Sequence, residues 1–165
     1  MNIFKVNGIF DLKKLVLCIF ISEGVGFLSA ALSMGTISAK YVQLVQPSFA
    51  PPGWVFGPVW SLLYFLMAIA CYRVWIAGTT EAPVSKSLFY YHLQLFFNFL
   101  WTIIFFRFQL RGWAFADIII LLLLIIITTI YFMKQDKISG YLMLPYIIWV
   151  SFASVLNFTI WQLNL

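Results

Sequence analysis

Five apolar runs dominate the 165-residue sequence, and each is long enough to cross a membrane as a helix. A bilayer core of about 30 Å needs roughly 20 helical residues, because an α-helix rises about 1.5 Å per residue. Continuous apolar sequence such as residues 118–127 does not alternate as a barrel strand would. We therefore predict an all-α fold, an integral membrane bundle of five transmembrane helices that forms a single domain over residues 1–165. The expected helices cover residues 15–34, 54–77, 88–106, 113–133 and 138–161.

The composition excludes most other classes of protein. Hydrophobic residues make up 64% of the chain and charged residues 9%, whereas a soluble domain has about 45–50% and about 25%. The basic residues lie singly at the ends of apolar runs and form no patch for nucleic acid, so the lipid bilayer is the expected surrounding partner. With one His and two Cys, we expect no metal site. Cys18 and Cys71 lie within apolar runs and are expected to be small buried side chains.

The basic residues also predict how the chain crosses the membrane. An odd number of spans places the two termini on opposite sides. The N-terminal side carries Lys5, Lys13, Lys14, Arg73, Lys86, Lys134 and Lys137, and the other side carries Lys40, Arg107 and Arg111. Because cytoplasmic loops are enriched in Lys and Arg, we expect a cytoplasmic N-terminus and an outside C-terminus in a bacterial-type cell membrane. The first run resembles a signal peptide, but its length and Glu23 favour a retained helix.

The connection between the first two helices is the longest. It covers residues 35–53 and contains Pro47, Pro51 and Pro52. Long loops in compact domains are often functional, so we expect this loop to cover a site.

Three of the runs carry polar or aromatic side chains at helical spacing. Gln94, Asn98 and Trp101 share one face of the third run, and this face should not point at lipid. It either lines a cavity or bonds to a neighbouring helix, and the spacing leaves both open. Trp60 and Tyr64 share a face in the second run. One face of the fifth run likewise carries Trp149, Ala153 and Leu156.

Two acids lie at membrane depth. Glu23 and Asp117 could handle protons or balance the charge of a ligand, or they could be hydrogen-bonded and fix helix packing. We favour packing, because neither acid has a basic partner at similar depth.

Several ordered segments resemble one family. Residues 46–60, QPSFAPPGWVFGPVW, are similar to the first loop and second helix of the translocator protein / tryptophan-rich sensory protein family, also called peripheral-type benzodiazepine receptors. Residues 94–101, 112–117 and 145–157 resemble its later helices. The resemblance runs in order from about residue 41 to residue 161, and the five spans agree with it.

The resemblance implies a five-helix bundle, commonly a homodimer, with a pocket under the first loop. It implies porphyrin or haem as ligand, with sterols or benzodiazepine-site drugs in some members, and no obligatory cofactor. The family's ligand contacts correspond to Tyr41, Pro51, Trp60, Asn98, Trp101, Trp149, Ala153 and Leu156, and the polar and aromatic stripes add Tyr64 and Gln94.

The sequence departs from the family pattern in three places. Phe49 replaces the Trp of the family's W-x-P-P loop motif, and Lys40 replaces the Trp that usually precedes Tyr41. Phe158 and Gln162 do not meet the sterol-recognition pattern, which is weak in any case, so we do not expect high-affinity sterol binding.

These observations lead to a functional expectation. We expect a tetrapyrrole-binding membrane protein that acts as sensor, regulator or carrier. Trp60, Trp101 and Trp149 would flank the ring. Asn98 would bond to its edge, and Lys40 or the loop backbone would meet the propionates. The alternative is a light-dependent porphyrin-degrading enzyme that uses Trp60 and Trp149. A third possibility is a proton-coupled transporter that uses Glu23 and Asp117.

Overall fold

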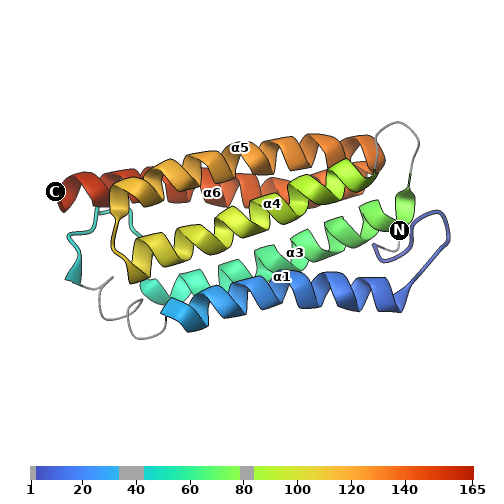
Figure 1. Ribbon diagram of the computed structural model, residues 1–165, viewed down its shortest axis with the longest axis horizontal. Coiled ribbons are helices and arrows are strands. Elements are labelled where there is room, and N and C mark those ends of the chain that lie inside the picture. The colour runs from blue at the N-terminus through green and yellow to red at the C-terminus, as the bar shows by residue number, and fades with distance from the viewer. Residues whose placement is uncertain (1–2, 34–42, 79–83) are drawn as a thin grey trace.

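Five long antiparallel helices make up the structure, a computed structural model that describes residues 3–33, 43–78 and 84–165 (Figure 1). Each helix is long and apolar enough to span a membrane, which confirms the predicted bundle. The elements are α1 (Leu12–Ser33), the 3-10 turn η1 (Gly53–Val55), α3 (Phe56–Ala77), α4 (Val84–Thr102), the π-helical turn η2 (Ile103–Arg107), α5 (Arg111–Gln135) and α6 (Lys137–Leu163).

Most helix ends lie a few residues beyond the apolar runs that predicted them. For example, the run expected over residues 113–133 is part of a helix over Arg111–Gln135. Polar residues at a membrane interface do not stop a helix, so hydropathy alone underestimates its length. The long loop predicted over residues 35–53 falls partly on residues 34–42, which lie outside the described residues.

The contacts between the helices show the order in which they pack around the bundle. α3, α6, α5 and α4 follow one another around the bundle, and α1 packs on the side of α3 and, less extensively, against α4. The two ends of the chain lie at opposite ends of the bundle (Figure 1). α1 is the least buried of the five helices. A larger share of its residues is therefore partly or fully exposed than in any of the other four helices.

Two contacts hold α1 near its N-terminal half. The hydroxyl of Ser22 shares a hydrogen bond with the hydroxyl of Tyr91 on α4. Cys18 on α1 faces Cys71 on α3, and their Sγ atoms are 3.8 Å apart. Both cysteines are free and buried, as expected from their apolar surroundings.

A buried ion pair closes the end of the bundle that holds the N-terminus. Arg73 on α3 donates from Nε to Oδ2 of Asp136 (2.7 Å) and from Nη2 to Oδ1 (3.0 Å). Its Nη1 donates to the carbonyl oxygen of Ile3 (2.7 Å), which ties the N-terminal segment to the same cluster. In the sequence, Arg73 was only a marker of membrane sidedness. The structure adds a second role, because this side chain joins α3 to the turn between α5 and α6.

Asp136 is the single residue between α5 and α6, and it also caps α6. Its Oδ2 accepts hydrogen bonds from the backbone N–H of Ser139 (2.8 Å) and from the hydroxyl of Ser139 (2.7 Å). Burial alone would raise the pKa of the Asp136 carboxyl, but the hydrogen bonds from Arg73 and Ser139 lower the pKa below its usual value of about 3.9. The carboxylate therefore stays charged in the folded protein.

Replacing Asp136 tests this cluster. Asp136→Asn keeps a side chain that can cap α6 but leaves the Arg73 guanidinium buried without its counter-charge. We expect a loss of about 3 kcal/mol in the free energy of unfolding, at the low end of the range for broken buried pairs because the Asp136 side chain is 15% exposed. Thermal unfolding in detergent, followed by circular dichroism, measures it.

The matched control is Asp11→Asn at the start of α1. Asp11 also caps its helix, accepting from the N–H of Lys14, but its ion pair with Lys14 is long (3.9 Å) and exposed, so we expect a change below about 1 kcal/mol. Equal stability of the two variants would contradict the assignment.

The contribution of Asp136 to stability depends on pH with a defined sign. The folded-state pKa of Asp136 is lowered, so its stabilisation is present above about pH 4 and is lost as the pH falls through that folded pKa.

Candidate functional site

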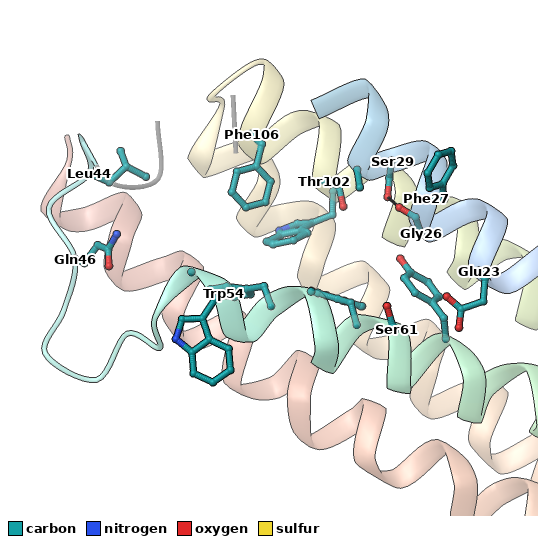
Figure 2. Close-up of a pocket in the computed structure, with 17 residues that line it drawn as sticks. Glu23, Gly26, Phe27, Ser29, Leu44, Gln46, Trp54, Ser61, Thr102 and Phe106 are labelled. Atoms are coloured by element: carbon teal, nitrogen blue, oxygen red, sulfur yellow. Dashed lines mark hydrogen bonds between the residues drawn. The ribbon is translucent and has the colours of Figure 1, made fainter. Parts of the chain in front are cut away.

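A cavity of about 1140 Å³ lies between α1, α3 and the end of α4 with η2 (Figure 2). It lies at the end of the bundle where the first loop leads into η1 and α3, which we call the loop end. Residues 44 and 46 of the first loop border it (Figure 2). The side chains of Phe27 and Trp54 line the cavity although they are 73% and 75% exposed. The cavity is therefore open at the surface of the bundle. Its lining residues are Glu23, Gly26, Phe27, Ser29, Ala30, Leu44, Gln46, Gly53, Trp54, Phe56, Gly57, Trp60, Ser61, Tyr64, Trp101, Thr102 and Phe106.

Aromatic rings from two helices form the walls. On α3, Trp60 and Tyr64 are four residues apart and their rings lie 5.6 Å centre to centre, tilted by 31°. On α4, the ring of Trp101 stacks on Phe105 at 5.3 Å. The π-helical turn η2 begins two residues after Trp101 and places Phe106 at the cavity. The sequence predicted that Trp60 and Tyr64 share one face of a helix. It did not predict the π-helical turn.

A chain of buried hydrogen bonds supports Tyr64 from behind the cavity wall. The hydroxyl of Tyr64 donates to Oδ1 of Asn98, and Nδ2 of Asn98 donates to the hydroxyl of Tyr146 (2.7 Å). Tyr146 in turn donates to Oε1 of Gln94 (3.0 Å). Each amide of this chain thus bonds to a neighbouring helix, one of the two alternatives that the spacing left open. Gln94 and Asn98 lie behind Tyr64 and are not among the residues that line the cavity.

Trp101 is held in place by a residue outside the predicted set. Its Nε1 donates to Oδ1 of Asn157 on α6 (3.0 Å), and Nδ2 of Asn157 donates to the carbonyl oxygen of Arg111 (3.1 Å). An amide in an otherwise apolar span was the available signal, because an amide at membrane depth needs a partner. Asn157 therefore orients the indole that forms one wall.

The remaining predicted residues lie behind or beside these walls. Trp149 is half-buried and packs against Phe56 and Phe152, with ring centres 5.9 and 5.6 Å away. Ala153 and Leu156 line a separate hollow of about 20 Å³, which Trp101, Phe56 and Phe106 also border. Pro51 is half-buried and precedes η1 without lining the cavity. Tyr41 and Lys40 lie outside the described residues. The structure thus brings together Trp60, Tyr64 and Trp101 in one cavity.

The two membrane-depth acids occupy different environments. Glu23 lines the cavity from α1 and is half-buried. Asp117 is buried on α5 and is not among the lining residues, and its Oδ2 has no hydrogen-bond partner within the described part of the chain. The sequence favours a packing role for both acids. For Glu23, the cavity provides a different surrounding, in which a ligand could contact the carboxylate.

The fold and the cavity define a class, namely integral membrane proteins with an aromatic pocket between transmembrane helices. Within this class the sequence matches the TspO/MBR family over residues 18–162. The chain belongs to the TspO/MBR family, and the resemblance inferred from the sequence is confirmed.

Individual relatives cover most of the chain. It is 39% identical to the "Tryptophan-rich protein TspO" of Archaeoglobus fulgidus over 154 residues, which are 93% of this chain and 99% of the relative. It is 36% identical to the "Translocator protein" of Homo sapiens over 126 residues, 75% of this chain and 74% of the relative. It is 38% identical to the "Tryptophan-rich sensory protein" of Cereibacter sphaeroides over 124 residues, 75% of this chain and 76% of the relative.

A glycine on α1 determines how closely this helix approaches the ring of Tyr64. A Cβ atom at Gly26 would lie 2.7 Å from Cδ2 of Tyr64 and closer still to Cε2. The Tyr64 ring is buried and its hydroxyl is hydrogen-bonded, so the ring has little freedom to move away. We expect Gly26→Ala to lower the free energy of unfolding by about 1–3 kcal/mol through overpacking. The melting temperature in detergent measures the loss.

Gly24→Ala is the matched control on the same helix. A Cβ atom at Gly24 would meet nothing within 4 Å, so this change removes backbone freedom without a clash. We expect an unchanged or slightly raised melting temperature. If both alanine variants melt at the same temperature, the contact between Gly26 and Tyr64 does not set the position of α1.

Proposed function

We propose that this protein binds a tetrapyrrole, porphyrin or haem, in the cavity between α1, α3 and α4 and acts as sensor, regulator or carrier. The observation that carries the proposal is the cavity of about 1140 Å³ with indole and phenol rings on its walls. Pockets for small molecules usually measure about 300–1,000 Å³, so this one has room for an unusually large ligand. A flat apolar disc is well suited to burial against aromatic faces.

The charges around the cavity favour one orientation of such a ligand. A porphyrin carries two carboxylates on one edge, and Glu23 lies at the end of the cavity away from the first loop (Figure 2). Like charges at short distance in a membrane interior repel strongly, because the low dielectric weakens screening. The propionates would therefore point towards the loop end, where water is close. Lys40, which lies outside the described residues, stays the candidate cation from the sequence.

The cellular setting follows from the same reasoning. We propose a bacterial cell membrane with the loop end and the C-terminus outside, because Lys and Arg are concentrated on the N-terminal side. A homodimer is implied by the family resemblance.

Porphyrin titration tests the proposed site. Protoporphyrin IX should quench the tryptophan fluorescence of the purified protein in a saturable way. Trp60→Ala removes a stacking wall, and we expect about tenfold weaker binding, which corresponds to about 1.4 kcal/mol. Trp149→Ala should weaken binding less, because Trp149 does not line the main cavity.

The control for the titration is Trp113→Ala on α5. Trp113 is 71% exposed and does not contribute to the cavity, so its removal should leave the affinity unchanged. Unchanged affinity in Trp60→Ala as well, with both variants folded, would rule out this cavity as the porphyrin site.

A second candidate function is light-dependent porphyrin breakdown. Three indoles, those of Trp54, Trp60 and Trp101, line the cavity, and an indole can donate an electron to an excited porphyrin. Steady illumination of the complex should then bleach the porphyrin absorption band. We expect the bleaching rate to fall at least fivefold, roughly estimated, in Trp60→Phe at saturating porphyrin, because phenylalanine keeps the stacking but not the electron donor. Bleaching at the rate of free porphyrin in the same detergent would exclude the enzymatic function.

A further inference from the structure

Glu23 is the charged group of the cavity among its described lining residues, which include no Lys or Arg. It comes from α1, and Figure 2 shows it at the end of the cavity opposite to Leu44 and Gln46, with Ser61 of α3 nearby. In the described ranges no basic side chain lies within ion-pair distance of its carboxylate. A carboxyl group is costly at membrane depth, so a place beside an open cavity suggests that a ligand supplies the missing partner.

The surroundings of Glu23 suit a particular kind of partner. Phe27 lies one turn further along α1, and Trp60 and Tyr64 line the same cavity from α3. Aromatic faces attract organic cations through the ring quadrupole, and a carboxylate adds a charge-assisted hydrogen bond. Because Phe27 and Trp54 are largely exposed, the cavity is also open at the lipid-facing surface of the bundle. A ligand that dissolves in the bilayer could therefore reach it.

We propose that Glu23 sets a charge preference at the inner end of this cavity, so that among planar aromatic ligands of one shape a protonated amine at that end is favoured over a neutral or an anionic group. The amine donates a hydrogen bond to the Glu23 carboxylate while the aromatic part stacks on Trp60. A carboxylate at the same position of the ligand is repelled. The inference rests on the proposed function only in that both assign ligand binding to this cavity.

Three pyrene probes of nearly the same shape test the proposal. They are 1-pyrenemethylamine, 1-pyrenemethanol and 1-pyrenecarboxylate, which are cationic, neutral and anionic at pH 7. The protein is placed in nanodiscs of phosphatidylcholine, which has no net charge, and energy transfer from tryptophan to pyrene reports binding. We expect the amine to bind about tenfold more tightly than the alcohol, because its positive charge adds an attraction to the carboxylate that a neutral hydroxyl lacks, and the carboxylate to bind most weakly.

Glu23→Gln is the decisive variant. Glutamine has nearly the same shape but no charge, so the preference for the amine over the alcohol should disappear while the affinity for the alcohol stays within about twofold. Partition of each probe into the bilayer is the same for both proteins and cancels in the comparison. Asp117→Asn is the matched control, because it also removes a membrane-depth carboxylate but one that does not line the cavity. It should keep the tenfold preference.

The outcomes separate this inference from the proposed function. Preference for the amine that survives in Glu23→Gln, or no preference in the unmodified protein, overturns the role of Glu23. Protoporphyrin IX is titrated into the same samples. If it does not bind but the preference for the amine depends on Glu23, the tetrapyrrole proposal fails and the inference stands. If it binds in a Trp60-dependent way while the pyrenes are not distinguished, only the inference fails.

Discussion

Hydrogen bonding between helices at membrane depth is the interaction on which the rest of this structure depends. Lipid offers no partner to an amide or a hydroxyl, so each such group in a span must bond within the protein. Tyr64, Asn98, Tyr146 and Gln94 satisfy one another and connect α3, α4 and α6. Apolar side chains pack almost equally well against lipid and against each other, so this polar chain also specifies which helix faces meet.

The cavity follows from the way α1 is attached to this framework. Ser22 and Cys18 hold its first half against Tyr91 and Cys71, and Gly26 lets it approach the Tyr64 ring. Beyond that point the cavity separates α1 from α3. Near its end, Arg107 of η2 donates to the carbonyl oxygen of Leu32 (3.3 Å). α1 is therefore held on both sides of the cavity, which keeps a space at the loop end of an otherwise well-packed bundle.

The walls of the cavity and its supports come from different residues, and only part of this division was predictable. Trp60, Tyr64 and Trp101 were expected in one pocket from their helical spacing and from the family resemblance, and they line one cavity. Gln94 and Asn98 share the same helix face as Trp101, yet they lie in the hydrogen-bonded layer behind the cavity. The spacing of side chains on one helix does not show where the neighbouring helix contacts it. The sequence therefore could not separate the residues that line the cavity from the residues that support it.

Sequence alone determined that the chain spans a membrane with five helices. The length and continuity of an apolar run are local properties, and they decide whether a helix can cross the hydrocarbon core of a bilayer. It also identified the family, through ordered motifs around the prolines and tryptophans. Only the tertiary structure decided that Glu23 lines the cavity while Asp117 does not, and that Asn157 orients Trp101. These outcomes depend on the rotation of each helix about its own axis. That rotation is set by contacts between residues far apart in the sequence, such as Tyr64 and Asn98, which are 34 positions apart, and Trp101 and Asn157, which are 56 apart, and no local pattern encodes such contacts.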